Sequence, residues 1–347
     1  MTSLHDNQVV VTGASFVRAD RFDSESVGSQ TFETYNLHNH LPKKGLRFRS
    51  ESARLFCSNA FEAVRVAEFG AVMQDRPDRV GVYHATELAN LEDVFDFDLT
   101  AKNDGPANVS PMRAPNTLAN VASGEFSIQT GITGPNVTVS SGFTSGLTAL
   151  DVAMWHLEDA QTDGALVGSV DVHSHYHQRL WEAENGHGDT PLAPEMAAAI
   201  VLERADSAKE RQAHVLCALV GSAAGHAGGV DQSPAERVLS ILGKAQSRVP
   251  EGGADTVNTL IICAEEDNGL SNELAEIWAR VGDTGDLPKI EVLARKDAYG
   301  DNTHGLEGVS RAFDKFETLS DSASGQRIAV VALDRRGICS SVIFEKV

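Results

Sequence analysis

The hydrophobic pattern is clearest in residues 136–153, which read NVTVSSGFTSGLTALDVA. Val137 and Val139 belong to a short β-branched run that is typical of a buried strand. Residues 140–142, Ser-Ser-Gly, interrupt this run, and apolar residues then recur at roughly helical spacing as far as residue 157. The pattern predicts a strand, a sharp turn and a helix, with Phe143 in the turn from which the helix starts.

Position 143 is chemically informative because of this placement. A helix N-terminus carries unpaired N–H groups and the positive end of the helix dipole. A cysteine there would be activated, because such an environment favours the thiolate. The residue is Phe143, whose ring has no nucleophilic atom. The segment therefore has the architecture for covalent catalysis without the nucleophile.

The rest of the chain alternates apolar runs with amphipathic stretches, which is the order typical of an α/β protein. Strands are predicted over 8–15, 79–85, 165–172, 214–221, 257–264, 290–293, 327–333 and 340–344, and helices over 52–70, 234–248, 274–281 and 305–316. The acidic stretch 92–105 is expected to be an exposed loop. Because the order of elements repeats, we expect two similar halves, residues 1–190 and 191–347, in one compact unit.

Two stretches carry a resemblance to the β-ketoacyl synthases of the thiolase superfamily. Residues 139–150 resemble that family's nucleophile elbow, V-[DS]-[ST]-A-C-[AST]-[ST]-[GS]-L-x-A-[IL], with Gly142 at the alanine and Phe143 at the cysteine. Residues 115–139 resemble the lead-in to that elbow, which opens with P-N and closes with [ST]-I-x-x-G-x-x-G-P-N-x-T-V. The resemblance implies a thiolase-like α/β fold, in which two similar βαβ-rich halves stack as five alternating layers, αβαβα.

The same resemblance implies where the other catalytic groups belong. Condensation in this family needs a thiolate that holds the acyl chain and two histidines that stabilise the enolate. The first histidine position follows the strand 257–264, where Glu265 and Glu266 stand, and the second is occupied by Asp301. The family's glycine-rich loop near the C-terminus is represented by residues 334–339, of which only Gly337 is kept. Three replacements together predict that condensation chemistry is absent.

The preferred interpretation is a catalytically inactive subunit that resembles the ketosynthase chain-length factors. Such a subunit pairs with an active ketosynthase by joining the strand before the elbow across a two-fold axis, and it forms part of the wall of the acyl tunnel in polyketide or fatty-acid-like biosynthesis. The acyl carrier protein would be reached indirectly, through the partner. Candidate tunnel or interface residues are Val139, Ser141, Phe143 and Thr144.

Two other interpretations stay open. The chain could be a thiolase-fold acyltransferase or decarboxylase that uses Asp301, His304, Glu265 or Glu266, or a homodimeric scaffold or ligand-binding protein. Cys339 is a conceivable replacement nucleophile, but a buried strand thiol is the simpler interpretation of its position.

Composition and charge exclude several classes of binding partner and indicate a compartment. The net charge of −20 argues against nucleic acid and anionic membranes, and an acidic surface would also repel an acidic carrier protein. No run of about 18 apolar residues predicts a membrane span, and the first 15 residues lack the pattern of a signal peptide. The four cysteines lie far apart and are expected to be reduced thiols, so the cytoplasm is the expected compartment and no metal or cofactor is predicted.

Two clusters of polar residues are candidate sites. His173, His175 and His177 alternate, and on a strand they would share a face, which is one way to bind a metal. Surface or interface histidines are the preferred interpretation. The basic residues Lys43, Lys44, Arg47, Arg49 and Arg54 resemble a basic loop of ketosynthases, and a solvated loop is the simpler alternative.

Overall fold

The computed structural model describes residues 6–19, 46–185, 195–226, 232–249, 257–265, 267, 269–281, 287–295, 302–320 and 323–347. The strands are β1 (Val9–Ala19), β2 (Val80–Ala85), β3 (Asn136–Val139), β4 (Gly164–Asp171), β5 (Glu195–Arg204), β6 (Cys217–His226), β7 (Thr259–Ala264), β8 (Lys289–Ala294), β9 (Arg327–Leu333) and β10 (Ile338–Glu345). The helices are α1 (Glu51–Val66), α2 (Gly70–Asp75), α3 (Leu91–Asn103), α4 (Val121–Thr130), α5 (Ser145–Glu158), α6 (His175–Asn185), α7 (Ala205–Glu210), α8 (Pro234–Gln246), α9 (Leu270–Val281) and α10 (His304–Thr318).

The strands form one continuous ten-stranded sheet in the order β3-β2-β4-β5-β1-β6-β10-β9-β7-β8. Its two five-stranded parts, β3-β2-β4-β5-β1 and β6-β10-β9-β7-β8, are called the first sheet and the second sheet below. The order is the same on either side of the β1–β6 junction, because β6 to β10 occupy the places of β1 to β5. In each half the first three strands from the outer edge run parallel, and the other two are antiparallel to their neighbours. The expected repeat is therefore visible in the strand pairing.

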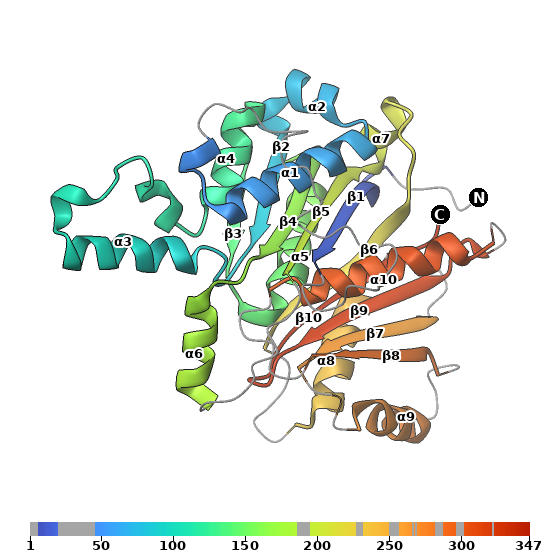
Figure 1. The fold of residues 1–347 in the computed structure, drawn as a ribbon. Helices are drawn as coiled ribbons and strands as arrows, with labels where there is room; N and C mark the ends of the chain where they lie inside the picture. The colour runs from blue at the N-terminus through green and yellow to red at the C-terminus, as the bar shows by residue number, and fades with distance from the viewer. Residues whose placement is uncertain are drawn as a thin grey trace.

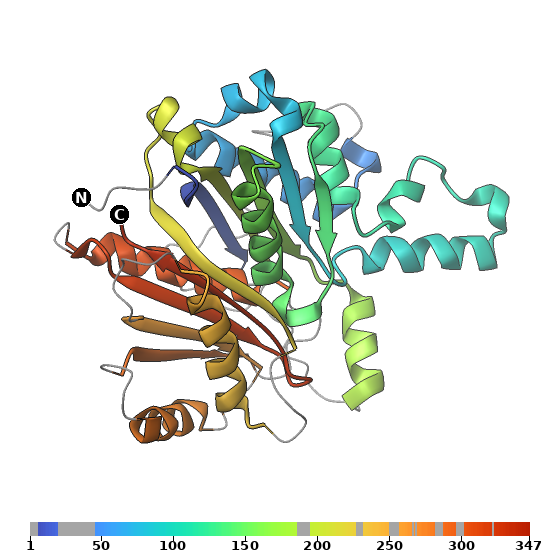
Figure 2. The ribbon, with the colours of Figure 1, turned by 180° about the vertical axis from the view of Figure 1, so that it is seen from behind.

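Three hydrophobic cores lie between the layers of helices and strands. The central core joins α5 and α10 to the inner faces of both sheets, one outer core packs α1 and α4 on the first sheet, and the other packs α8 and α9 on the second. Figure 1 shows α1 and α10 from one side, and Figure 2 shows α5 in front of the sheet from the other side. This arrangement confirms the predicted α/β fold with five layers.

The repeat seen in the strands divides the chain later than the predicted boundary at residue 190. β5 follows that boundary, yet it pairs with β1 and β4 of the first sheet. β6 is the first strand that pairs with β10. The division into residues 1–190 and 191–347 stays a prediction, and strand pairing places β5 with the first half.

One predicted element is wrong. The stretch expected to be an acidic loop forms helix α3, which projects from the body together with the turns that follow it (Figure 1). Leu91, Phe95 and Leu99 recur at helical spacing within it, but the acidic residues between them hide this pattern. None of the helices in the described part of the chain is long and apolar enough to cross a membrane.

The two central helices meet at their first turns through a reciprocal contact. A Cβ on Gly146 of α5 would lie 2.7 Å from Cγ of Leu306, and a Cβ on Gly305 of α10 would lie 2.9 Å from Cγ of Leu147. Each helix thus presents a glycine to the leucine of the other. The glycine and leucine of this contact are adjacent in the sequence, as Ser-Gly-Leu at the start of α5 and His-Gly-Leu at the start of α10.

Candidate functional site

The predicted elbow is present, at the outer edge of the first sheet. β3 ends at Val139, a short 3-10 turn covers Gly142–Thr144, and α5 begins at Ser145. Gly142 has φ +63°, a conformation that glycine adopts without strain. β3 is only partly buried, in contrast to the buried strand that was predicted, because it is an edge strand paired with β2. Phe143 is buried and belongs to the central core.

Hydroxyl groups hold the turn together. The Ser145 hydroxyl accepts a hydrogen bond from Ser141 N at 2.8 Å and donates one to the Gly142 carbonyl at 2.7 Å. The Thr144 hydroxyl donates to the Ser141 carbonyl at 3.1 Å. The Thr148 hydroxyl lies 2.7 Å from that of Ser340 on β10, which connects the elbow to the second sheet. Of the predicted site residues, Ser141 and Thr144 therefore have structural hydrogen bonds within the turn.

His304 lies beside Phe143, although 160 positions separate them in the sequence. The two ring centroids are 4.9 Å apart and the rings are inclined by 59°. His304 is 1% exposed, its Nδ1 lies 2.8 Å from the Glu307 carboxylate, and its Nε2 lies 2.8 Å from the Leu293 carbonyl. His304 stands three residues after Asp301, which occupies the family's second histidine position, and the structure places it beside Phe143 as the first residue of α10.

A buried carboxylate fixes the start of α10. Asp171, at the end of β4, accepts hydrogen bonds from the backbone N–H of Asn302 at 3.1 Å and of Thr303 at 2.9 Å. The side-chain amide of Asn302 also donates to Asp171, and Ser169 donates to Asn302. All four residues are buried. This contact joins the end of a first-half strand to the second-half helix that carries His304.

The remaining predicted positions are Glu265, Glu266, Asp301 and Cys339. Glu265 follows β7 and lies 3.7 Å from Arg335, and its pKa is raised because the carboxylate is partly buried. Asp301 and Glu266 lie outside the described residues. Cys339 is buried on β10 beside a tight turn in which Asp334 accepts from the Ile338 N–H at 2.8 Å, and burial fits the interpretation of a strand thiol.

The histidine cluster is not arranged as a strand. α6 begins at His175, so the three histidines do not share a strand face, and the rings of His173 and His177 lie 5.3 Å apart. Burial lowers the pKa of His177 to about 4. Within the described ranges, no group of three or more His, Cys, Asp or Glu residues could hold a metal ion.

The predicted basic patch is divided between separate contacts. Arg47 lies over the ring of Phe48 at 4.6 Å, and Arg49 forms an ion pair with Glu125 at 2.6 Å. Arg54 belongs to helix α1 and not to a loop, while Lys43 and Lys44 lie outside the described residues. The patch is therefore not one surface among the residues that are described.

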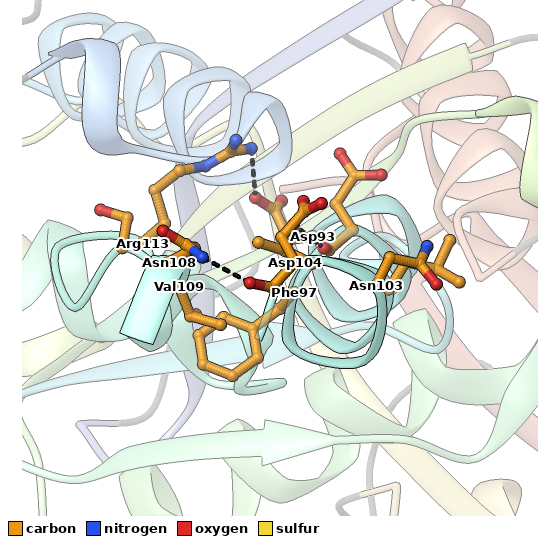
Figure 3. A pocket seen from close by; sticks show the side chains of 11 residues that line it. Asp93, Phe97, Asn103, Asp104, Asn108, Val109 and Arg113 are labelled. Atoms are coloured by element: carbon orange, nitrogen blue, oxygen red, sulfur yellow. Dashed lines mark hydrogen bonds and ion pairs between the residues drawn. The ribbon is translucent and has the colours of Figure 1, made fainter. Parts of the chain in front are cut away.

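A pocket of about 350 Å³ lies away from the elbow, between α3 and the segment that follows it (Figure 3). Three carboxylates line it, and Arg113 lies 3.3 Å from that of Asp93. Burial raises the pKa of Asp93, and the hydrogen bond from Asn116 and the charge of Arg113 only partly offset this. The pocket is polar, with Phe97 as one of its few apolar walls.

Sequence reasoning missed three carboxylates at the elbow. Asp171 and Glu307 act on the start of α10, and the Glu87 carboxylate lies 3.5 Å from the place of a Cβ on Gly142. Asp171 is a charged residue within the predicted strand 165–172, which is the one signal that could have found it. Glu87 and Glu307 have no comparable signal, because only the fold brings them near the elbow.

Comparison with known proteins identifies the family. Residues 11–184, half of the chain, match the model of the family described as beta-ketoacyl synthase, N-terminal domain. The chain belongs to the β-ketoacyl synthase family.

Its curated relatives include the 3-oxoacyl-[acyl-carrier-protein] synthase 2 of Staphylococcus aureus, 24% identical over 209 residues, which cover 54% of this chain and 51% of the relative. The corresponding synthase of Vibrio cholerae is 28% identical over 100 residues, or 29% of this chain and 24% of the relative. The chain thus spans about half the length of the first of these curated relatives.

Solved ketosynthase structures share the fold over almost the whole chain. The ishigamide ketosynthase/chain length factor has a TM-score of 0.70 at 20% identity and covers 98% of this chain and 99% of its own. AntDE:AntF, described as a type II PKS acyl-carrier protein in complex with its ketosynthase bound to the hexaketide, has a TM-score of 0.73 at 15% identity with the same coverage. At these identities the likeness establishes the thiolase-like fold of this ketosynthase homologue.

Proposed function

We propose that this ketosynthase homologue is a non-condensing subunit of the chain-length-factor type, which pairs with an active ketosynthase and shapes the wall of its acyl tunnel. The observation that carries the proposal is Phe143. Its ring is buried at the turn that starts α5, where the family pattern has cysteine. A phenyl ring forms no thioester, so an acyl chain has no covalent attachment at this position.

The surface around the elbow supports pairing with another chain. β3 is the outermost strand of the first sheet, so one of its edges faces no described strand. Helix α4 packs beside β3 and carries Ile128, which is 79% exposed. On the turns before α4, Met112 and Leu118 are exposed to 59% and 57%. An exposed apolar side chain beside a free strand edge is typical of a protein–protein interface.

The alternative, an acyltransferase or decarboxylase that uses Asp301 and His304, has less support. Both nitrogens of His304 already have protein partners, Glu307 and the Leu293 carbonyl. A ring with two occupied nitrogens has none left to take a proton from a substrate. The contacts of His304 therefore favour a structural role.

The first test identifies the partner. Tagged protein is purified from its native cell and analysed by size exclusion and mass spectrometry. We expect a stoichiometric second chain with an intact Cys-His-His ketosynthase site. A clean homodimer without such a chain would sink the proposal and favour the scaffold interpretation.

The second test locates the interface. Ile128→Asp places a charge on α4 beside β3, and we expect it to weaken the complex at least about 30-fold, or about 2 kcal/mol. Leu287→Asp is the matched control, because Leu287 is exposed to 47% in the second half of the chain. Equal effects of the two variants would place the interface elsewhere. Once a partner is known, Phe143→Ala should change the length of the product if residue 143 faces the shared tunnel.

A further inference from the structure

Arg237, the fourth residue of α8, carries a charge that no described residue pairs with. Its Nε is closed to solvent and has no hydrogen-bond partner. The residue also lies close to the N-terminus of the helix, where a positive charge opposes the helix dipole. A partly desolvated charge without a counter-charge costs free energy. Arg237 therefore destabilises its surroundings unless an anion binds to it.

The guanidinium of Arg237 lies on the turn between β9 and β10. The Gly337 N–H donates to the Asp334 carbonyl at 3.1 Å, and the Asp334 N–H donates to the Ile338 carbonyl at 3.0 Å, so the turn is tight. Gly337 has φ +86°, a left-handed conformation that suits glycine in such a turn. A Cβ on Gly337 would lie 2.8 Å from Nη1 of Arg237 and 3.2 Å from Nε2 of His226. The guanidinium therefore occupies space that a side chain at position 337 would need.

The same turn carries two more arginines, Arg335 and Arg336, and both are exposed. Burial raises the pKa of Glu265, and the charges of these two arginines partly offset this, so both lie near that carboxylate. Nε of Arg335 is 3.7 Å from Glu265, which is too long for a hydrogen bond. The other nearby carboxylate, Asp334, accepts from a backbone N–H of the turn at 2.8 Å. Three arginines thus meet two carboxylates in a chain whose net charge is −20.

Regular elements hold these arginines in place at one end of the second sheet. The last residue of β6, His226, pairs with Ile338, the first residue of β10, so the end of β6 and the turn lie side by side (Figure 2). α8 packs on both of these strands. Because the turn and the start of α8 are both fixed by hydrogen bonds, the three guanidinium groups need little ordering before they bind a ligand.

We propose that Arg237, Arg335 and Arg336 form a binding site for a phosphate group at this end of the second sheet. A guanidinium forms two parallel hydrogen bonds to phosphate oxygens. A phosphate monoester has a charge of about −1.5 to −2 at pH 7 and three acceptor oxygens, so it can contact more than one arginine. The positive end of the α8 dipole favours the same ligand. This inference does not depend on the proposed pairing with a ketosynthase.

Titration calorimetry of the full chain with inorganic phosphate at pH 7 tests the inference. The ionic strength is held constant with sodium chloride, because salt screens exposed charges. We expect saturable binding of one phosphate with a Kd of about 1 mM or tighter. A titration that stays linear far beyond this concentration would overturn the inference.

Removing the unpaired charge should weaken the binding. We expect Arg237→Gln to lower the affinity for phosphate at least about tenfold. Arg280→Gln is the control, because Arg280 is an exposed arginine of α9 that pairs with Glu276, and its affinity should stay within about twofold of the wild type. Equal affinities of the two variants would contradict the inference. Arg237→Gln should also be at least as stable as the wild type in urea without phosphate, whereas a loss of stability would indicate a structural role instead.

A second variant displaces the guanidinium and keeps its charge. Gly337→Ala places a methyl group against Nη1 of Arg237, and we expect at least about threefold weaker phosphate binding. Gly325→Ala is the control, because Gly325 has φ +87° with nothing within 4 Å of its would-be Cβ. It has the same backbone strain without the contact, so its affinity should not change. Equal binding by these two variants would show that the position of Arg237 does not matter for the ligand.

Two further anions identify the ligand. We expect acetate, which has a single negative charge and two oxygens, to bind at least about tenfold more weakly than phosphate. Equal affinities for acetate and phosphate would overturn the assignment of a phosphate site. Methyl phosphate separates the two sources of the group: tighter binding of the ester would identify a phosphate ester as the ligand, and tighter binding of inorganic phosphate would identify the free ion.

Discussion

The starts of α5 and α10 occupy equivalent places in the two halves, yet they are held by different chemistry. Each helix follows an outer parallel strand, enters the central layer and packs a glycine on the leucine of the other. The first is held by uncharged hydroxyl groups around Phe143. The second is held by the Asp171 carboxylate and by the ion pairs of Glu307 with Arg18 and Arg295.

The difference shows which part of the repeat the fold requires. The Gly–Leu crossing is present on both sides because the two backbones must approach closely there. The polar groups around it can differ, since they need only satisfy the buried atoms of each turn. The polar groups at the two helix starts can therefore change while the crossing of the two helices stays intact.

Breaking the crossing should have the largest effect. In Gly146→Val the new side chain meets Leu306, and its Cβ would lie 3.4 Å from the Asn302 carbonyl as well, so we expect a loss of about 3 kcal/mol or more in the free energy of unfolding. Gly305→Val should cost somewhat less, because the neighbours of Gly305 are side chains only. Urea denaturation measures both.

The control for the crossing is Gly243→Val. Gly243 lies on α8 with nothing within 4 Å of its would-be Cβ, so the change should stay within about 0.5 kcal/mol. A Gly146→Val variant as stable as this control would show that the two helices do not need a close approach.

Removing the Asp171 contact between the two halves should have the next largest effect on stability. Asp171→Ala leaves the N–H groups of Asn302 and Thr303 buried without their acceptor, and we expect a loss of about 2–3 kcal/mol. Asp98→Ala is the control, because Asp98 forms an exposed pair with Lys102 that is worth less than about 0.5 kcal/mol. Thermal unfolding measures both variants. Equal losses of stability in Asp171→Ala and Asp98→Ala would show that the Asp171 contact does not stabilise the fold.

The sequence predicts the elbow well because its signal is local. A β-branched run, a small-residue turn and helical periodicity lie within residues 136–153, and each depends on near neighbours. The same holds for α8, where Ser233 and Glu236 form the capping box and Pro234 opens the helix. Such elements need no knowledge of the tertiary structure.

The sequence does not predict the surroundings of Phe143, because they come from the other half of the repeat. His304 reaches the elbow through the crossing of two helices, and Asp171 reaches the start of α10 across the central layer. The alternating residues His173, His175 and His177 show the converse. Surface or interface histidines are the interpretation preferred from the sequence, but the chain enters α6 at His175 and buries His177, which their spacing does not show.

The interaction energy between Phe143 and His304, at the two helix starts, should be smaller but measurable. In a double-mutant cycle of Phe143→Leu and His304→Gln, we expect a coupling of about 1 kcal/mol, the size of a buried contact between two aromatic rings. The control cycle pairs His304→Gln with Phe126→Leu, since Phe126 belongs to the outer core. Additive effects in both cycles would mean that the two rings are neighbours without an interaction.

The acid dependence of stability should show the smallest effect, and its sign follows from Glu307. The folded-state pKa of this carboxyl lies below its ordinary value, because the His304 hydrogen bond and the charges of Arg295 and Arg18 outweigh its burial. Its contribution is complete above the ordinary pKa of about 4.3 and is lost as the pH falls through the lower folded value. The urea midpoint of the wild type should therefore exceed that of Glu307→Gln by a constant amount near pH 5 and by a shrinking amount toward pH 3. Glu317→Gln should show no such convergence, since Glu317 is exposed on the same helix. If the curves for wild type and Glu307→Gln stay parallel down to pH 3, the charge of Glu307 does not stabilise the start of α10. The two helix starts would then differ in their residues but not in how charge contributes to their stability.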